Sequence, residues 1–337
     1  MGICFGLAAF GVFAAGPLNR CEAFYYTKNQ GLARVIGYHQ GMFSYRHAFH
    51  AGNHADVLKH MVLLALLKHM TLKETPFTVM DTHAGAGLYR LDGDYAQTSA
   101  EASQGFLKLA QTSPAQPWAP LVQDYLDMVA GFNAAGQWKV YPGSPFICQQ
   151  PLRGRDKLKL FELHPTDSKT LTANIAQLEA GRQVAITRED GFEAVKKFLP
   201  PPSRRALLLC DPSYEIKSDY GRTAAMVADA LTRFATGNYM VWYPIIPRPE
   251  AHDLPRKLRT LANKAGKSWL DITLSVKSSK LLQDDAGETV RPGLPASGVF
   301  LINPPFTLKA QLALALPQLV QALKQDTHAR HTLESGG

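Results

Sequence analysis

The hydrophobic residues of the chain gather in short runs, which are separated by longer stretches with helical spacing. Seven such runs lie at 77–81, 158–164, 183–188, 205–211, 237–245, 269–276 and 297–303. Apolar runs of this length, bounded by turn residues, predict β-strands. Strands that alternate with helices build a mostly parallel sheet through right-handed crossovers. The pattern therefore predicts an α/β fold with a mostly parallel, seven-strand sheet.

One long helical segment interrupts this alternation after the first strand. Residues from 88 to about 140 show no convincing strand pattern, and a proline-punctuated linker at 112–120 precedes an amphipathic helix at 121–132. A rigid turn of sequence YPGSP, at 141–145, ends the segment. We interpret 88–140 as a helical subdomain inserted after the first strand.

Another helix is predicted ahead of the first strand. Asn53 is a suitable N-cap for it. Five apolar residues then recur on one face at helical spacing, namely Leu58, Met61, Val62, Ala65 and Leu66. We expect Lys59 and His60 to face a ligand on the inner side of this helix.

The histidines near the start of this helix raise the question of a metal site. His50 and His54 are four residues apart, but no glutamate accompanies them as in an H-E-x-x-H motif. Gly52 lies between them and argues against a helix there. We therefore predict no metal site.

The composition changes this picture in two respects. Among 337 residues, 46% are apolar and 19% are charged, as in globular proteins, and the net charge of +8 favours a polyanionic partner. The four cysteines are scattered, without metal or disulfide spacing. We expect a cytoplasmic protein that does not engage a membrane.

The first 41 residues differ from the rest of the chain. Their apolar stretch at 3–15 is too short to span a bilayer. A signal peptide normally has basic residues before its apolar stretch, and none precedes this one. We expect the functional start at Met42, with 1–41 an extension that is disordered or results from start-codon choice. The main domain is then expected at 42–316, followed by a helix end and tail at 317–337.

Three acidic residues fall at consecutive predicted strand ends, namely Asp81, Glu162 and Asp190. Such ends line one crevice in an open α/β sheet. An acid at the second strand end suits the hydroxyls of a ribose, and Asp190 suits an exocyclic amine such as adenine N6. The glycine-rich turn at 85–87 lacks a third glycine and a Walker lysine, which argues against dinucleotides and nucleoside triphosphates. S-adenosylmethionine therefore fits better than NAD.

The buried run that ends at Asp211 carries the candidate chemistry. Pro212 stops the strand, so that Asp211 opens onto the carboxyl end of the sheet. In methyl transfer to an exocyclic amine, the Asp211 carboxylate and the Pro212 carbonyl would accept the two N–H bonds while Tyr214 stacks on the base. A similar segment, Asn303-Pro-Pro-Phe306, ends the last strand, but antiparallel pairing is expected to point it toward the opposite edge.

Together these segments resemble the RlmJ family, bacterial methyltransferases that act on adenine N6 in 23S ribosomal RNA. The likeness covers about 42–316 and rests on SYRHAFHAGNHADVLKH, DTHAGAG, YPGSP, ELHP, EDGF, LPPPSRRALLLCDPSYEIKSDY and RFATGNYMVWYP. The resemblance implies a Rossmann-like class I methyltransferase fold, a monomer, and S-adenosylmethionine as cofactor.

The resemblance also implies roles for single residues. The implied cofactor contacts are Lys59, His60, His83, Ser144, Glu162, Asp190, Gly191 and Asp211. Asp211 is also the implied catalytic carboxylate, and Tyr45 is implied to lie near the RNA. The family carries a second proline where this chain has Ser213, which predicts slower chemistry at worst.

The implied partner is 23S ribosomal RNA, either protein-free or in an early assembly intermediate. The segment 248–280 holds eight basic and three acidic residues, which suits electrostatic contact with phosphates. Two alternatives stay open, a nucleic-acid-binding protein for the uptake or use of external DNA, and a DNA adenine methyltransferase. The second is disfavoured because no separate target-recognition domain is seen.

Overall fold

The computed structural model describes residues 50–92, 101–279, 282–283, 289–290 and 293–337. The chain divides between Met42 and Phe43, and every described residue belongs to the second part. The extension at 1–41 lies outside the described residues, as does Tyr45, the residue implied to lie near the RNA.

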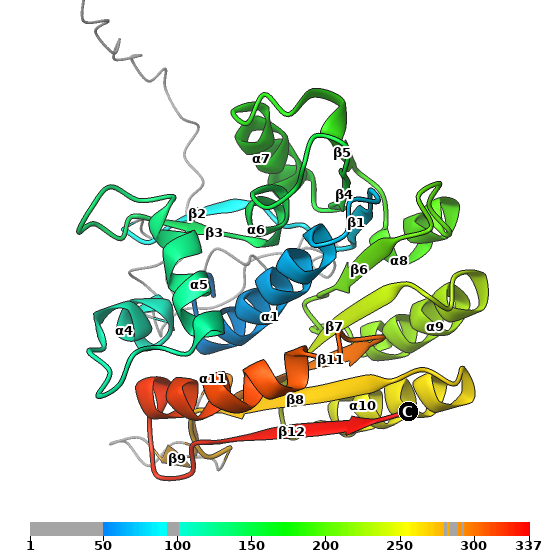
Figure 1. Cartoon of the computed structure of the whole chain (residues 1–337). Coiled ribbons are helices and arrows are strands. Elements are labelled where there is room, and N and C mark those ends of the chain that lie inside the picture. Colours follow the sequence, from blue (N-terminus) through cyan, green and yellow to red (C-terminus); the bar gives the residue numbers. More distant parts are fainter. Residues whose placement is uncertain (1–49, 93–100, 280–281, 284–288, 291–292) are drawn as a thin grey trace, which may run out of the picture. The chain divides into compact units, whose positions relative to one another are not determined.

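Helices and strands alternate along most of the described chain (Figure 1). The helices are α1 (His54–Thr71), α3 (Glu101–Gln104), α4 (Phe106–Gln111), α5 (Pro120–Ala130), α6 (Ser144–Gln149), α7 (Pro165–Ala176), α8 (Gly191–Ala194), α9 (Ser218–Arg233), α10 (Pro249–Lys264) and α11 (Leu308–Leu323). The strands are β1 (Thr78–Asp81), β2 (Leu88–Arg90), β3 (Val140–Pro142), β4 (Lys157–Phe161), β5 (Val184–Thr187), β6 (Ala206–Cys210), β7 (Asn238–Ile245), β8 (Trp269–Ser275), β9 (Leu282–Gln283), β10 (Thr289–Val290), β11 (Ala296–Ile302) and β12 (Arg330–Gly336).

The main sheet has eight strands within the described residues, in the order β12-β8-β11-β7-β6-β1-β4-β5. The five neighbours from β7 to β5 are parallel, whereas β11 pairs antiparallel with both β7 and β8. The predicted α/β fold with a mostly parallel sheet is confirmed. The strand that carries the candidate chemistry, β6, lies beside β1 in the middle of the sheet, as expected.

Where a helix end and tail were expected at 317–337, the tail forms an eighth strand, β12. It pairs antiparallel with β8 along the edge of the sheet, from Arg330 opposite Ser275 to Gly336 opposite Trp269. Its residues alternate between half-buried and exposed, and Leu333 is its one large apolar residue. An edge strand of this kind presents no apolar run, and the hydrophobic pattern therefore did not reveal it.

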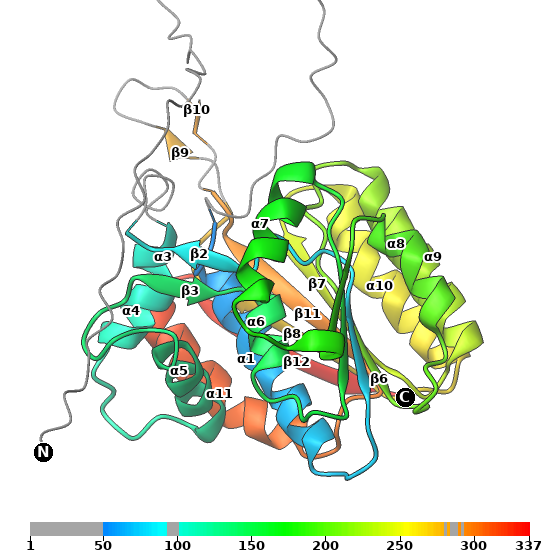
Figure 2. The same cartoon turned by 90° about the horizontal axis from the view of Figure 1, so that it is seen from above.

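Two helical layers enclose the sheet, as Figure 2 shows from above. One layer contains α1, α5, α7 and α11, and the hydrophobic core beneath it is filled by residues such as Leu58, Leu209 and Leu316. The other layer contains α8, α9 and α10 and packs on residues such as Leu208 and Tyr239. The strands β6 and β7 alternate their side chains between these two cores, as a strand with period two must.

The helix α1 is buried on nearly all sides, which differs from the single apolar stripe expected from its sequence. Asn53 caps it as predicted, its Oδ1 accepting hydrogen bonds from the backbone N–H groups of Ala55 and Asp56, each at 2.9 Å. The predicted stripe is buried, but so are Leu63, Leu64 and Leu67 on the opposite side. A helix that is apolar all round lies inside the protein, and here the inserted helices and α11 cover the side that faces away from the sheet.

The predicted helical insertion contains two short strands that its sequence did not reveal. β2 and β3 pair antiparallel, with Tyr89 opposite Tyr141, and they join the two ends of the segment at 88–140. The helices α3, α4 and α5 lie between them in the described part of the chain. Each strand has only three residues, which is too short for a periodic pattern to be read from the sequence.

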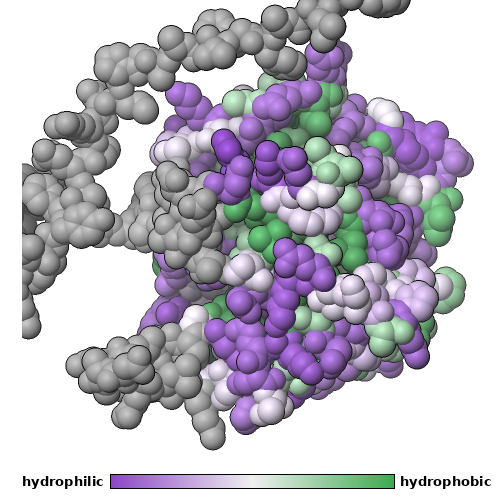
Figure 3. Space-filling model, turned by 90° about the vertical axis from the view of Figure 1, so that its left-hand side faces the viewer, coloured by the Kyte–Doolittle hydropathy of each residue, from purple (hydrophilic) through white to green (hydrophobic). Residues whose placement is uncertain are grey.

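The carboxyl ends of β1, β4, β6 and β7 point to one side of the protein (Figure 1). Figure 3 views that side and shows a recess near its middle where hydrophobic residues gather, with hydrophilic residues around it. Ligands of open α/β sheets bind outside the carboxyl ends of the strands, so this side is where the candidate site is expected.

The segment that begins at Asn303 lies at the other edge, as its antiparallel strand predicted. β11 runs against β7 and β8, and Asn303 Nδ2 donates to the carbonyl oxygens of Ala235 and Gly237 at the start of β7. The backbone φ of Asn303 is +57°, a conformation that asparagine tolerates better than most residues. Asn303 therefore ties the ends of two strands together, far from the carboxyl ends of β1 and β6.

Candidate active site

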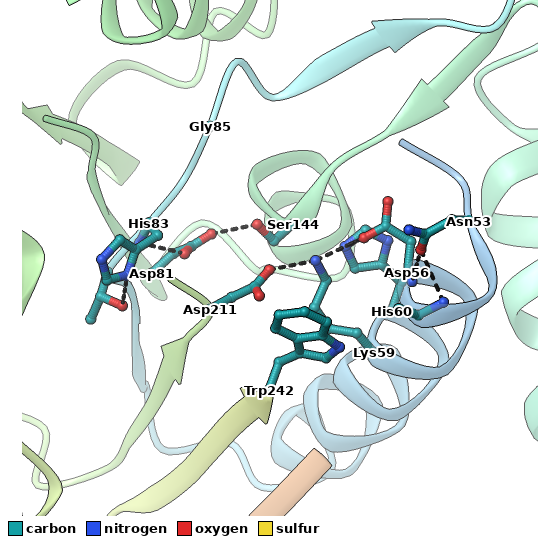
Figure 4. A network of polar contacts seen from close by, with 12 residues as sticks. Asn53, Asp56, Lys59, His60, Asp81, His83, Gly85, Ser144, Asp211 and Trp242 are labelled. Carbon is teal, nitrogen blue, oxygen red and sulfur yellow. Dashed lines mark hydrogen bonds and ion pairs between the residues drawn. The ribbon is translucent and has the colours of Figure 1, made fainter. Parts of the chain in front are cut away.

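Asp211 follows β6 directly, and its side chain is 14% exposed. Its Oδ2 accepts a hydrogen bond from Lys59 Nζ at 2.5 Å. Lys59 belongs to the second turn of α1, so this contact joins two residues that are 152 positions apart. Figure 4 shows the pair at the centre of a network of polar contacts. The predicted inward orientation of Lys59 thus places its ammonium on the candidate catalytic carboxylate.

A second carboxylate shares Lys59. Asp56 Oδ1 lies 2.8 Å from Lys59 Nζ, and Asp56 Oδ2 accepts a hydrogen bond from the backbone N–H of Gly52 at 2.9 Å. Burial alone would lower the pKa of Lys59, but the Asp211 and Asp56 carboxylates outweigh it and raise that pKa. The ammonium is therefore charged, and the three groups together carry one net negative charge.

His60 occupies a different place from the one predicted. Its side chain is 1% exposed, and Nδ1 lies 2.8 Å from the hydroxyl of Tyr141. That hydroxyl also lies 2.8 Å from the hydroxyl of Tyr125, in the inserted subdomain. A side chain enclosed in this way presents no surface to a ligand. His60 instead joins α1 to the insertion and so fixes the helix that carries Lys59.

Asp81 and Ser144 form the next part of the network (Figure 4). The Ser144 hydroxyl donates to Asp81 Oδ2 at 2.6 Å, and the backbone N–H of His83 donates to Asp81 Oδ1 at 3.2 Å. Burial raises the pKa of Asp81 to about 7, although these hydrogen bonds oppose the increase. Asp81 therefore holds the first turn of α6 against the end of β1, and it positions the predicted cofactor contact Ser144.

Glu162 links the end of β4 to the glycine-rich turn. Its Oε2 accepts from the backbone N–H of Gly85 at 2.8 Å, and its Oε1 accepts from the backbone N–H of His164 at 2.7 Å. Burial raises the pKa of Glu162, while these two N–H groups lower it. Gly85 has φ +61°, and a Cβ there would lie 2.4 Å from the hydroxyl of Tyr89. The turn therefore needs glycine at this position in order to reach the carboxylate.

Asp190 caps the short helix α8 through a hydrogen bond from the backbone N–H of Phe192 at 3.1 Å. Its Oδ2 also pairs with the guanidinium of Arg222, on α9. The Arg222 guanidinium lies 4.4 Å from the centre of the Phe192 ring. The centre of the His83 ring lies 4.7 Å from the centre of the same Phe192 ring. Burial lowers the pKa of His83 to about 4, so its ring is neutral. These contacts fix the Asp190 carboxylate beside the end of β1.

Close packing against Thr82 leaves no room for a side chain at Gly191. A Cβ at this position would lie 2.0 Å from the carbonyl oxygen of Thr82, so any other residue would push α8 away from the end of β1. The ends of β1, β4 and β5, at which Asp81, Glu162 and Asp190 were predicted, are thus neighbours in the sheet. The local sequence pattern did not reveal this close approach of Gly191 to Thr82.

Tyr214 does not have the orientation that base stacking needs. Its ring is 2% exposed and lies 4.5 Å from the ring of Tyr220, in the core beneath α9. Its hydroxyl donates to the carbonyl oxygen of Trp242 at 2.8 Å. The backbone φ of Tyr214 is +55°, and the chain thereby turns the side chain back under the sheet. In this conformation Tyr214 anchors the loop instead of covering a base.

Arg248 also contacts the loop that contains Tyr214. Its Nη1 donates to the carbonyl oxygen of Tyr214 at 3.0 Å. Arg259, in the same predicted RNA-binding segment, pairs with Asp271 and Glu334. These two arginines are therefore engaged within the protein, whereas Arg256 and Lys257 are exposed on α10.

Three residues of the site were missed by sequence reasoning, namely Asp56, Arg222 and Trp242. Asp56 had a usable signal, because it lies three positions before Lys59 and thus on the same side of a helix. Arg222 and Trp242 had none, since the strands and helices that carry them are far from their neighbours in the sequence. Within the described ranges, no three His, Cys, Asp or Glu side chains group as metal ligands. The helices of the same ranges include none with the length and apolarity to cross a membrane.

Comparison with known proteins supports the predicted family. The family model described as "Ribosomal RNA large subunit methyltransferase D, RlmJ" matches residues 74–334. The Escherichia coli protein named ribosomal RNA large subunit methyltransferase J is 39% identical over 280 residues, which cover 82% of this chain and 93% of the relative. Its Haemophilus influenzae namesake is 37% identical, covering 87% and 98%.

A solved structure shows the same fold. Protein LPL1258 from Legionella pneumophila is 31% identical, with a TM-score of 0.74, and the match covers 85% of this chain and 98% of that protein. The matches lend no support to the alternatives of DNA uptake or DNA methylation. Because the family model spans most of the described chain and both relatives exceed 30% identity, the chain belongs to the RlmJ family of ribosomal RNA large subunit methyltransferases.

Proposed function

We propose that this protein transfers a methyl group from S-adenosylmethionine to the N6 amine of an adenine in 23S ribosomal RNA. One observation carries the proposal, which is the Asp211 carboxylate at the end of the central strand β6, fixed by Lys59 at 2.5 Å. A carboxylate in that place can accept a hydrogen bond from an amine and direct its lone pair. The names of the relatives, both ribosomal RNA methyltransferases, agree with this chemistry.

The residues at the ends of β1, β4 and β5 fit the cofactor. Glu162 offers acceptor oxygens to ribose hydroxyls, and Asp190 offers them to the amine of the cofactor's adenine. The turn at Gly85 approaches closely enough for backbone contact. The net negative charge of Asp56, Lys59 and Asp211 favours a sulfonium cation beside it. Acceptor oxygens and a net negative charge of this kind suit a nucleoside with a positive charge better than a phosphate.

The reaction then depends on how the chain holds the amine. The cofactor supplies a sulfonium methyl group, and the electron pair of the broken S–C bond stays on sulfur. Asp211 Oδ1 and the Pro212 carbonyl accept the two N–H groups of the adenine, which draws the conjugated lone pair toward the methyl group. Lys59 holds Asp211 Oδ2 and thereby fixes the orientation of the carboxylate. The proton that nitrogen loses passes to Asp211 and then to water.

A transfer assay tests the proposal. Protein-free 23S ribosomal RNA is incubated with labelled S-adenosylmethionine, and the RNA is digested to nucleosides in order to identify N6-methyladenosine. Wild type is expected to produce it. Asp211→Asn, which keeps the shape of the side chain and removes its charge, is expected to lose on the order of 10²- to 10³-fold in rate.

A matched control separates this effect from a general loss of charge. Asp229 is a half-exposed carboxylate on α9 that pairs with Arg233, and Asp229→Asn is expected to leave the rate unchanged. Label in another nucleoside, or no transfer to any RNA by wild type, would reject the proposal.

The state of the substrate and of the protein is part of the same proposal. We propose that the substrate is 23S ribosomal RNA without ribosomal proteins or in an early assembly intermediate, and that the protein acts in the cytoplasm as a monomer. The family resemblance supports these points. Parallel assays with free RNA and with assembled large subunits, together with sedimentation of the purified protein, would test them.

A further inference from the structure

Two aromatic side chains near Asp211, those of Tyr214 and Trp242, have ring centres 6.0 Å apart and differ in their exposure. In β6 and β7, Cys210 pairs with Val241, and both face the core beneath α9 and α10. The preceding pair, Leu209 and Met240, faces the core beneath α1. Side chains alternate along a strand, so the Trp242 side chain leaves β7 on the α1 side, and its partly buried indole packs against both cores.

Asp211 lies on that same side, because its carboxylate contacts Lys59 of α1. Figure 4 shows the Trp242 indole beside the Lys59 side chain and next to the Asp211 carboxylate. Tyr214, in contrast, belongs to the core on the other side of the sheet. Among the described residues, the partly exposed aromatic ring beside the catalytic carboxylate is therefore that of Trp242.

The indole of Trp242 has features of a ligand contact. Its ring is only partly buried, yet Nε1 is enclosed and has no hydrogen-bond partner among the described residues. The exposed part of the ring is what a stacked base would cover. The backbone of Trp242 is firmly placed, since its carbonyl oxygen accepts from the Tyr214 hydroxyl at 2.8 Å.

We infer that Trp242 is the platform on which the target adenine stacks, and that Tyr214 is a positioning residue which ties the Asp211 loop to the strand carrying that platform. This inference rests on the proposed function and deepens it. A base that stacks on Trp242 has its edge directed toward Asp211, the carboxylate that accepts its amine. The hydrogen bond between Tyr214 and Trp242 then fixes the distance between the platform and the acceptor.

Fluorescence provides a direct test. The chain has four tryptophans, and adenosine is titrated into protein saturated with S-adenosylhomocysteine, which fills the cofactor site. We expect adenosine to quench the emission of wild type and of Trp269→Phe, a control whose indole N–H is already bonded to Asn263 at 2.9 Å. The quenching should disappear in Trp242→Phe. Equal quenching in Trp242→Phe and wild type would overturn the inference.

Kinetics distinguish a stacking role from a structural one. Trp242→Ala is expected to raise KM for RNA on the order of 10- to 100-fold, the usual effect of losing a base–aromatic stack, whereas Trp242→Phe should keep most of the wild-type value. The dissociation constant for S-adenosylmethionine, measured by calorimetry, should be unchanged in both. Equal losses in both variants, together with weakened cofactor binding, would show a structural role and overturn the inference.

The outcomes also separate this inference from the proposed function. If wild type methylates RNA and Trp242→Ala does so with an unchanged KM, the stacking role fails while the methyltransferase function stands. If wild type methylates no RNA, the proposed function fails, and adenosine quenching still decides whether Trp242 binds the base.

Discussion

The turn at Asp211 and the turn at Asn303 look alike in sequence, but the structure gives them opposite tasks. Each turn begins with a polar residue directly after an apolar strand. A proline comes next, and an aromatic residue lies two positions after that proline. Asp211 is half-buried at the carboxyl end of β6 and pairs with Lys59. Asn303 donates both of its amide hydrogens to backbone carbonyls at the start of β7, and Phe306 beside it is 90% exposed.

The difference between the two turns comes from strand direction. β6 runs parallel to β1, so its end meets the ends of β4 and β5, where the acidic side chains gather. β11 runs antiparallel, so its end meets the beginnings of its neighbours. A turn sequence thus gains a chemical role only from the side of the sheet on which it falls.

The largest effect is expected from breaking the contact that the Asn303 turn lacks. Lys59→Met keeps the length of the side chain but removes the ammonium from between Asp211 and Asp56. We expect methyl transfer to fall about 100-fold or more, because two buried carboxylates are left without their cation. Lys68→Met, an exposed lysine on the same helix, should behave as wild type in the same assay. A Lys59→Met variant that is folded and fully active would contradict this account.

A smaller effect is expected at the acidic strand ends that surround Asp211. Glu162→Ala removes the acceptor of the Gly85 and His164 N–H groups and the proposed ribose contact. We expect the dissociation constant for S-adenosylmethionine to rise on the order of tenfold or more in calorimetry, as for the loss of a charged hydrogen-bond partner. Glu193→Ala, at an exposed position paired with Lys196, is the control. Unchanged cofactor affinity in Glu162→Ala would reject the cofactor placement.

The Asn303 turn should respond in stability and not in chemistry. Asn303→Ala removes two hydrogen bonds to backbone carbonyls and places alanine at φ +57°. We expect the free energy of unfolding to fall by about 1–3 kcal/mol, measured by denaturant titration. The transfer rate per folded molecule should stay at the wild-type value, and a selective loss of activity would show that this turn takes part in the reaction.

The smallest effect is expected at Ser213, where the family carries proline. Ser213→Pro restricts the loop between Asp211 and Tyr214, whose ends are already held by Lys59 and Trp242. We expect single-turnover methyl transfer to accelerate by less than about tenfold, because a stiffer loop loses less freedom on binding the amine. A slower variant would mean that Ser213 is adapted to the bent backbone at Tyr214.

The elements that carry the site could be predicted because each depends on a local pattern. Apolar runs closed by Asp81, Glu162 and Asp211 mark the ends of buried strands, and the spacing of β8 and β11 indicates their antiparallel pairing. The position of Asn303 at the opposite edge follows from that pairing alone. The order of the strands then brings the acids together without further information.

What could not be predicted depends on contacts across the fold. The positive φ of Tyr214 turns its ring into the core beneath α9, although an extended turn would leave it over the site. The enclosure of His60 results from Tyr141, in an insertion whose packing no pattern on α1 reveals. The edge strand β12 has too few apolar residues to differ from a tail. In each case a distant neighbour, and not the local sequence, decides the outcome.

The most direct measurement of the central claim compares Asp211→Asn and Asn303→Ala in one assay of methyl transfer to protein-free 23S ribosomal RNA. The account predicts that Asp211→Asn loses on the order of 10²- to 10³-fold in rate. It predicts that Asn303→Ala, assayed below its unfolding temperature, transfers methyl groups as fast as wild type. An Asp211→Asn variant with the wild-type rate, or an inactive Asn303→Ala variant that is folded, would contradict it.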